Sequence, residues 1–165
     1  MVPEGALAKA VAVLDACRAR ALRIVTAESC TGGLVAAALT EIAGSSDVVE
    51  GALVTYSNEA KAALLGVPAA LLAAHGAVSE PVARAMAEGA LLRAARAALG
   101  VSITGVAGPG GGSAEKPVGL VYIALARRGT STLCERHVFP GDRRAVRAAS
   151  VMRAFELLLT EAKRR

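Results

Sequence analysis

Residues 22–33 read Leu-Arg-Ile-Val-Thr-Ala-Glu-Ser-Cys-Thr-Gly-Gly. The fold class follows from the change, within this stretch, from a strand pattern to a helical pattern. Its first part, Leu22 to Thr26, is rich in residues that favour β-strands, and a helical pattern runs over Gly32 to Ala43. A strand that turns directly into a helix is the opening of an α/β unit. The turn, Ala27 to Gly33, places Ser29 just after the strand.

Helical and strand patterns alternate on both sides of this stretch. They predict a helix before it, over Glu4–Arg20. After it they predict strands over Val48–Tyr56 and Val101–Thr104, and a hairpin of the strands Val118–Ala126 and Thr130–Val138. The helices predicted after it cover Asn58–Leu65, Pro68–His75, Glu80–Ala98 and Asp142–Ala162. Strands separated by helices pair in parallel, whereas the predicted hairpin adds antiparallel members. We therefore expect an α/β protein, a three-layer α/β/α sandwich around a mixed sheet of about five strands.

Length and composition favour one globular domain over residues 1–165. Of the 165 residues, 54% are hydrophobic and 20% are charged, and no linker or repeat divides the chain. The N-terminus lacks a signal-peptide pattern, and Gly66, Pro68 and Gly76 break the one long uncharged stretch, which excludes a membrane-spanning helix there. We expect a cytoplasmic protein.

Cysteine, histidine and charge content limit the partners. Cys17, Cys30 and Cys134 are too widely spaced to form a disulfide framework, and two histidines without paired cysteines give no metal pattern, so we expect no metal and no cofactor. The net charge of +5 suits a phosphate-bearing substrate. Aromatic residues are only 2%, too few to stack on bases, so we expect no nucleic-acid partner. An alanine-rich surface leaves a homo-oligomer open.

Ligands of such a sheet bind at the carboxyl ends of its strands, and the first segment there is Thr26 to Gly33. Ser29 can act as a nucleophile, because unpaired N–H groups at the start of the next helix can form an oxyanion hole. The alternative is that Ser29 or Thr31 only caps that helix.

The second segment, Tyr56 to Lys61, supplies a base. We place Lys61 in the first turn of a helix, where the positive end of the helix dipole disfavours the ammonium and lowers its pKa. A neutral lysine can accept a proton from serine. The alternative is an ordinary solvated lysine.

The third segment, Thr104 to Pro117, is a glycine-rich loop that matches neither common nucleotide fingerprint. It either lets backbone approach a ligand closely or is a plain surface loop. A rival nucleophile is Cys30 paired with His75 or His137, although His75 sits at a predicted helix end and His137 inside a predicted strand.

The three segments, in this order, resemble the CinA C-terminal domain family, the nicotinamide mononucleotide amidohydrolases. The resemblance covers nearly the whole chain, and it rests on the motifs Thr26–Gly33, Val54–Lys61, Gly76–Glu80, Thr104–Pro109, Glu115–Gly119 and Gly141–Arg143. The resemblance implies a three-layer α/β/α fold and hydrolysis of the carboxamide of nicotinamide mononucleotide to nicotinate mononucleotide and ammonia, a step of pyridine nucleotide salvage. Larger members carry an upstream molybdopterin-binding-like domain, and we expect a stand-alone version here.

The resemblance also implies roles for single residues. Ser29 would attack the amide carbon, Lys61 would take its proton and later pass one to ammonia, and Tyr56 would sit between or beside them. Substrate contacts are implied for Thr31, Gly32 and Gly33 as donors to the oxyanion, and for Thr104, Gly105, Gly108 and Arg143 as holders of the nucleotide. The Arg143 guanidinium suits a phosphate, because it can pair with two oxygens at once.

Two other functions stay open. One is a non-catalytic nucleotide-binding accessory protein linked to competence or the DNA damage response, against which the intact Ser29, Tyr56 and Lys61 set argues. The other is hydrolysis of a different small amide, because the motifs define the reaction better than the base that is recognised.

Overall fold

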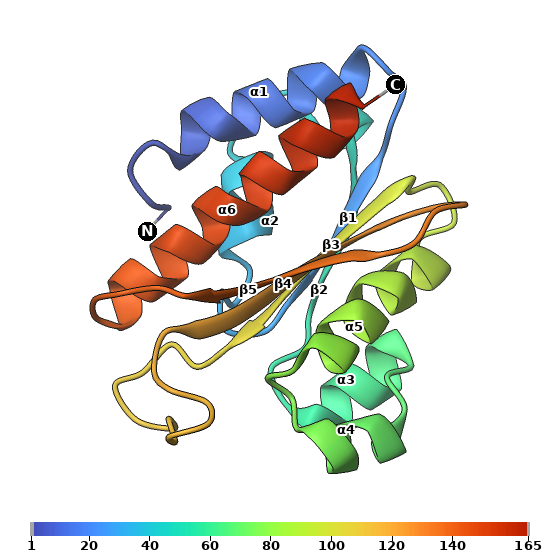
Figure 1. The fold of residues 1–165 in the computed structure, drawn as a ribbon. Coiled ribbons are helices and arrows are strands. Elements are labelled where there is room, and N and C mark those ends of the chain that lie inside the picture. The colour runs from blue at the N-terminus through green and yellow to red at the C-terminus, as the bar shows by residue number, and fades with distance from the viewer. Residues whose placement is uncertain (1, 165) are drawn as a thin grey trace.

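The computed structural model describes residues 2–164, which form a mixed sheet with the strand order β2-β1-β3-β4-β5 (Figure 1). In chain order the strands are β1 (Ile24–Glu28), β2 (Val49–Val54), β3 (Leu99–Gly105), β4 (Leu120–Arg127) and β5 (Leu133–Val138). β1 pairs in parallel with β2 and β3, whereas β4 pairs antiparallel with β3 and β5. The expected mixed sheet and its C-terminal hairpin are confirmed.

Helices cover both faces of the sheet (Figure 1). One face carries α1 (Ala6–Arg18), α2 (Leu34–Thr40) and α6 (Arg143–Lys163), and the other carries α3 (Asn58–Leu65), α4 (Ala69–His75) and α5 (Glu80–Arg93). The predicted three-layer α/β/α sandwich is therefore confirmed. None of the helices within residues 2–164 is both long and apolar enough to cross a membrane.

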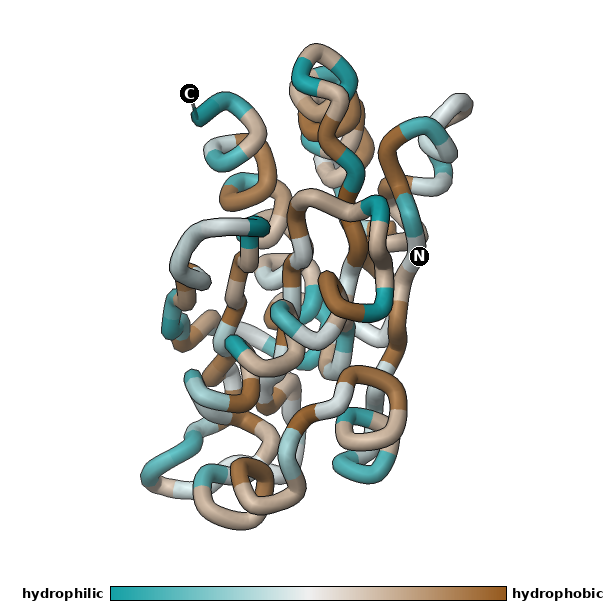
Figure 2. The backbone as a smooth tube through the Cα atoms, turned by 90° about the vertical axis from the view of Figure 1, so that its right-hand side faces the viewer, coloured by the Kyte–Doolittle hydropathy of each residue, from teal (hydrophilic) through white to brown (hydrophobic). Residues whose placement is uncertain are grey.

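Each face of the sheet has its own hydrophobic core. Ile24 and Ile103 pack with Phe155 towards α1, α2 and α6, whereas Val25 and Met86 belong to the core beneath α3, α4 and α5. Hydrophobic residues follow the strands and the inner faces of the helices, and hydrophilic ones gather in the turns (Figure 2). Helices on both faces explain why β1 is buried along its whole length and β3 along all but its last residue, rather than alternating between buried and exposed positions.

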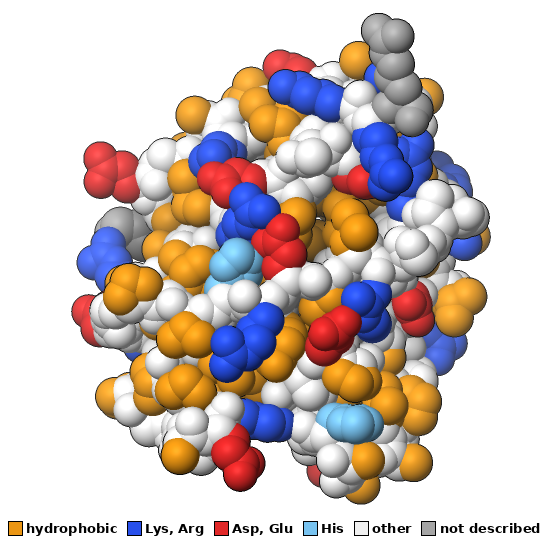
Figure 3. Space-filling view, viewed as in Figure 1, with side chains coloured by type: hydrophobic (Ala, Val, Ile, Leu, Met, Phe, Trp, Pro, Cys, Tyr) orange, Lys and Arg blue, Asp and Glu red, His pale blue; other side chains and the backbone are white. Residues whose placement is uncertain are grey.

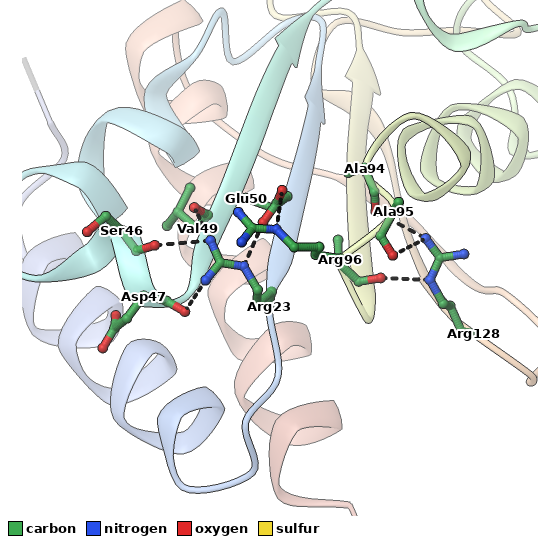
Figure 4. Close-up of polar contacts among 10 residues, drawn as sticks. Arg23, Ser46, Asp47, Val49, Glu50, Ala94, Ala95, Arg96 and Arg128 are labelled. Atoms are coloured by element: carbon green, nitrogen blue, oxygen red, sulfur yellow. Dashed lines mark hydrogen bonds and ion pairs between the residues drawn. The ribbon is translucent and has the colours of Figure 1, made fainter.

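The end of the long helix differs from the expectation. The prediction carried it to Ala98, but α5 ends at Arg93. Arg128, in the hairpin loop, donates hydrogen bonds to the carbonyl oxygens of Ala94 (3.0 Å) and Ala97 (2.8 Å), as Figure 4 shows for Ala94. These contacts satisfy carbonyls that a helix end leaves without partners. A long-range contact therefore sets where this helix stops.

Gly100 lies at a close contact between α5 and the sheet. It does not stop a helix but lies inside β3, where a Cβ atom would come 2.7 Å from the carbonyl oxygen of Ala87 in α5. The glycine therefore permits close packing of α5 on the sheet. The last strand likewise begins at Leu133 rather than Thr130.

An arginine cluster closes the amino end of the sheet (Figure 4). Arg23 donates to the carbonyl oxygens of Asp47 (2.7 Å) and Ser46 (3.0 Å) and to the carboxylate of Glu50 (2.6 Å), to which Arg96 also donates (3.1 Å). The two guanidinium groups lower the pKa of Glu50. These contacts occupy the amino edge of β1 and β2, opposite the edge at which Ser29 lies.

Charges of both signs interleave on the face formed by α1, α6 and β5 (Figure 3). Lys9 pairs with Glu156, Arg153 with both Glu156 and Glu135, and Glu135 with His137. The hydrogen bonds from Arg153 lower the pKa of Glu135 to about 2. Arg153 is therefore part of an ion-pair network rather than of a uniformly basic surface.

Candidate active site

Ser29 continues the edge of the sheet one residue beyond β1. Its N–H donates to the carbonyl oxygen of Ile103 (2.9 Å), so the pairing with β3 extends past Glu28. On the other side, the N–H of Thr55 donates to the carbonyl oxygen of Glu28 (2.8 Å). Because side chains alternate along a strand, Ser29 shares its face with the buried Ala27, the face covered by α3, α4 and α5.

Lys61 reaches Ser29 from α3. The helix begins after Ser57, whose hydroxyl accepts a hydrogen bond from the N–H of Ala60 (3.0 Å), and Lys61 is one turn further on. Its Nζ lies 3.1 Å from Oγ of Ser29 and donates to the carbonyl oxygen of Thr55 (2.8 Å). The side chain is 1% exposed. This burial excludes the solvated-lysine alternative.

The burial of Lys61 lowers the pKa of its ammonium group. The sequence predicted the same direction but a different cause, the helix dipole. In the structure the main cause is removal from water, which disfavours the charged form. A neutral Nζ has one lone pair, so it can accept the hydroxyl proton of Ser29 while still donating to Thr55.

Glu28 is the acceptor around which the turn is built. Its buried carboxylate accepts hydrogen bonds from the Thr31 hydroxyl (2.7 Å) and from the N–H groups of Gly33 (3.0 Å), Val35 (3.1 Å) and Ala36 (2.9 Å). A negative charge at a helix N-terminus is favourable, because the free N–H groups and the helix dipole both point at it. Glu28 therefore fixes the start of α2 relative to β1.

The donors expected for the oxyanion are partly used within the turn, which corrects the expectation. The N–H of Gly33 donates to Glu28, and that of Gly32 donates to the carbonyl oxygen of Ser29 (3.0 Å). Gly32 and Gly33 have positive φ angles, 59° and 94° respectively, which glycine adopts more readily than other residues. Within residues 2–164, the N–H groups of Cys30 and Thr31 donate to no other residue and stay available.

The helix-cap alternative also differs from the structure. The N-cap position of α2 is Gly33, and within residues 2–164 no side-chain oxygen of Ser29 or Thr31 accepts a hydrogen bond from the helix, although the carbonyl oxygen of Thr31 accepts one from the N–H of Leu34 (3.2 Å). Glu28, which lies further back in the strand, does so through its carboxylate. Ser29 therefore has no capping role that would account for it.

Arg147 holds the opposite side of the turn, and the sequence analysis missed it. From α6 it donates to the carbonyl oxygens of Cys30 (3.1 Å) and Thr31 (3.0 Å). Glu28 therefore accepts a hydrogen bond from the N–H of Gly33 in this turn, and the guanidinium of Arg147 donates to two of the turn's carbonyl oxygens. A signal was present: Arg147 follows Arg143 by four residues, which puts both on one side of the last predicted helix.

Arg143 connects two predicted site segments. Its guanidinium donates to the carbonyl oxygen of Gly108 (2.8 Å) and to the Tyr56 hydroxyl (2.9 Å). Tyr56 is 62% exposed, and within residues 2–164 it has no hydrogen bond to Ser29 or Lys61. The hydroxyl of Tyr56 therefore does not bridge Ser29 and Lys61 but is bound by Arg143, and the expected place of Tyr56 beside them stays a prediction.

Thr104 and Gly105 lie at the end of β3, next to Ser29. The Thr104 hydroxyl donates to the carbonyl oxygen of Ala77 (2.8 Å), which ties the sheet edge to the segment before α5. A Cβ atom on Gly105 would lie 2.8 Å from the carbonyl oxygen of Leu120. In this structure both residues have structural contacts, and a role in binding the nucleotide stays a prediction.

A pocket of about 770 Å³ lies beside the turn, a size that suits a mononucleotide. Its lining residues come from α6, the start of α2, the glycine-rich loop and the N-terminus, and include Arg143, Arg147, Leu34, Pro109, Val118 and Pro3. Ser29 and Lys61 are not among them. Arg143 both lines this pocket and donates a hydrogen bond to the hydroxyl of Tyr56.

The rival Cys30 nucleophile gains no support. Burial raises the pKa of its thiol to about 11, so it is protonated at neutral pH. His137 lies on β5, where it contacts Glu135 (2.7 Å), and His75 ends α4. Neither histidine contacts Cys30 in the described part of the chain. Residues 2–164 also hold no group of three or more His, Cys, Asp or Glu side chains placed to bind a metal.

The chain is similar over most of its length to proteins of one family. The family model of the CinA C-terminal domain matches residues 6–162. The nicotinamide-nucleotide amidohydrolase PncC of Escherichia coli (strain K12) is 54% identical over 144 residues, which are 87% of each chain. A CinA-like protein of Anaeromyxobacter sp. (strain Fw109-5) is 56% identical over 140 residues, which are 85% of this chain and 34% of that protein, so this chain spans about a third of its length.

Solved structures show the same fold. The competence/damage inducible protein CihA from Agrobacterium tumefaciens superposes with a TM-score of 0.93 at 46% identity, covering 97% of both chains. A CinA superfamily protein from Klebsiella pneumoniae 700603 superposes with a TM-score of 0.91 at 39% identity, covering 96% of this chain and 98% of that one. With the family model, these matches show that the chain belongs to the CinA C-terminal domain family.

Proposed function

We propose that this protein hydrolyses the carboxamide of nicotinamide mononucleotide to nicotinate mononucleotide and ammonia, with Ser29 as nucleophile and Lys61 as base. The observation that carries the proposal is the buried Nζ of Lys61, 3.1 Å from Oγ of Ser29. The similarity to PncC supports the substrate. We also propose that the reaction takes place in the cytoplasm and involves no nucleic acid.

The first half of the reaction forms an acyl-enzyme. Oγ of Ser29 attacks the amide carbon while its proton moves to the neutral Nζ of Lys61. The N–H groups of Cys30 and Thr31 stabilise the oxyanion that forms on the amide oxygen. Nζ then passes the proton to the amide nitrogen, the C–N bond breaks, and ammonia leaves with Lys61 neutral again.

Arg143 and the pocket of about 770 Å³ bind the phosphate end of the nucleotide in this proposal. Among residues 2–164, the guanidinium of Arg143 donates to a carbonyl and to a phenol hydroxyl, both neutral, and a phosphate would be a stronger acceptor than either. In this proposal the nucleotide also contacts Thr104, Gly105 and Gly108, the last of which accepts a hydrogen bond from Arg143 through its carbonyl oxygen. Tyr56 then positions the guanidinium of Arg143 in the lining of the pocket through the hydrogen bond to its hydroxyl.

Arg143→Ala is expected to raise KM for nicotinamide mononucleotide at least tenfold and to leave KM for the dephosphorylated riboside unchanged, since a charge-assisted bond to phosphate contributes about 1.5–3 kcal/mol. Steady-state ammonia release on both substrates measures this. Arg136→Ala, at an exposed arginine of β5 that is not among the residues lining the pocket, is the comparison and should change neither KM. Equal losses on the nucleotide and the riboside would show that Arg143 does not bind the phosphate.

The direct test of the function is ammonia release from nicotinamide mononucleotide, measured with a metal chelator present. The wild type is expected to turn over, and Ser29→Ala to lose at least about 10³-fold in kcat because no acyl-enzyme can form. Absence of turnover by folded wild type would overturn the proposal and favour the non-catalytic binding protein. Activity that survives in Ser29→Ala would move the nucleophile to another residue, with Cys30→Ala tested next.

A further inference from the structure

One polar group beside Ser29 has no hydrogen-bond partner among the residues that the structure describes. Thr55 is fully buried, and its Oγ1 is the buried side-chain polar atom that, among residues 2–164, makes no hydrogen bond. A hydroxyl removed from water and left unpaired is unfavourable, and proteins rarely keep one without a use. A water molecule or a substrate atom is the kind of partner that would satisfy it.

Thr55 stands next to Ser29 in the sheet. The pairs Glu28 with Val54 and Glu28 with Ile103 put Thr55 and Thr104 on the two sides of Ser29, on neighbouring strands about 4.8 Å apart. All three side chains lie on one face, so three hydroxyl groups form a row at the carboxyl edge. The Thr104 hydroxyl is used by Ala77, whereas the Thr55 hydroxyl is free.

Lys61 brings its amine to the same place. Its Nζ is bound by the carbonyl oxygen of Thr55 at 2.8 Å and lies 3.1 Å from Oγ of Ser29. One threonine therefore holds the base through its backbone and offers an unpaired hydroxyl on the side chain. A small molecule that bridges Nζ and Oγ1 would lie beside the carbon attached to Ser29.

The second half of the proposed reaction needs such a molecule. After ammonia has left, a water molecule must attack the acyl carbon, and Nζ alone would leave that water free to rotate. We infer that the Thr55 hydroxyl holds the hydrolytic water of the acyl-enzyme, an inference that rests on the proposed function. The water donates one hydrogen to Nζ and the other to Oγ1, so its lone pair points at the acyl carbon.

The bonds of this step balance without any further reactant. The water oxygen forms a bond to the acyl carbon as one water proton moves to Nζ of Lys61. The tetrahedral intermediate then breaks its bond to Oγ of Ser29, which takes the proton back from Nζ. The product leaves as a carboxylic acid that ionises in solvent, and Thr55 keeps its own proton throughout.

Thr55→Val tests the inference, because valine has the shape of threonine without the hydroxyl. With nicotinamide mononucleotide we expect a burst of about one ammonia per enzyme, then turnover at least tenfold slower than in wild type, with kcat and KM falling together. Intact-protein mass spectrometry should show the acyl-enzyme during this slow phase. Thr55→Ser keeps a hydroxyl and should restore turnover and remove the burst.

A purely structural role would give different results. Thr55→Val should melt at the same temperature as wild type or higher, because the lost hydroxyl has no partner in the chain. Ser102→Ala is the matched control: its buried hydroxyl lies on the same face and donates to the carbonyl oxygen of Ala83 (2.6 Å), so it should lower the melting temperature without any burst.

The outcomes separate this inference from the function on which it rests. If wild type releases ammonia but Thr55→Val shows linear release and no acyl-enzyme, the water-holding role is overturned and the function stands. If folded wild type releases none, the function itself fails. Thr55→Ala provides a second hydroxyl-free variant if the valine variant does not fold, and the same burst is expected from it.

Discussion

Lys61→Met is expected to lower kcat for ammonia release by at least about 10³-fold while the chain stays folded. Methionine has nearly the length of lysine and suits a buried site, but it has no group that can take the proton of Ser29. Since Lys61 is almost fully buried, losing its amine removes a polar group from the interior, and the free energy of unfolding should equal or exceed that of wild type. Chemical denaturation and the ammonia assay measure the two effects.

Lys9→Met is the control for Lys61→Met. Lys9 lies on α1 and pairs with Glu156 on the far side of the sheet, so its loss should leave kcat unchanged. A Lys61→Met variant that keeps a tenth or more of wild-type kcat would show that another group accepts the proton.

The lowered pKa of Lys61 also sets a pH dependence. Between its pKa in the folded chain and its ordinary value of 10.5, the unfolded chain binds one more proton than the folded one. The contribution of this group to stability therefore rises with pH across that window and is least below it. The same deprotonation should give kcat/KM a rising limb centred below 10.5. In Lys61→Met the stability component should disappear, and a curve that is unchanged would contradict the assignment.

Glu28→Gln is expected to lower the free energy of unfolding by about 2–4 kcal/mol, because a buried charged acceptor is replaced by a neutral amide. The amide retains one acceptor oxygen and directs an NH₂ group at the N–H groups that the carboxylate now accepts from. Urea unfolding followed by circular dichroism measures the loss.

The same substitution should also reduce kcat at least tenfold at a temperature where the variant is folded, because Glu28 orients the turn that carries Ser29. Glu41→Gln, at the exposed C-terminal end of α2, is the control and should change neither quantity. A Glu28→Gln variant as stable as wild type would mean that its hydrogen bonds contribute no net stability.

The fold could be predicted because each helix and strand has a recognisable pattern in its own stretch of sequence. Apolar runs, helical periodicity and breakers at Gly66 and Gly76 identify each element, and the order of strands and helices implies a mixed sheet with helices on both faces. The same order brings Ser29 and Lys61 to one sheet edge, because the carboxyl ends of parallel strands meet there. The structure places them 3.1 Å apart.

What the sequence could not show depends on contacts between distant segments. Arg128 ends α5 from a loop more than thirty residues later, and Arg147 holds the turn at Cys30 from the last helix. The contact of Arg128 has no periodic signal, because one long side chain makes it across the fold, and the four-residue spacing of Arg147 from Arg143 shows their shared helix side but not what Arg147 binds.

The roles of the hydrogen-bonding groups at the site were likewise settled only by the tertiary structure. The residue types around Ser29 suggested free N–H donors at Gly32 and Gly33, but burial of Glu28 beneath the turn takes up the donor of Gly33. Burial also lowers the pKa of Lys61 and, within residues 2–164, leaves the Thr55 hydroxyl without a partner. Element order is determined by local propensity, whereas the state of a donor or a base depends on which distant side chains exclude water from it.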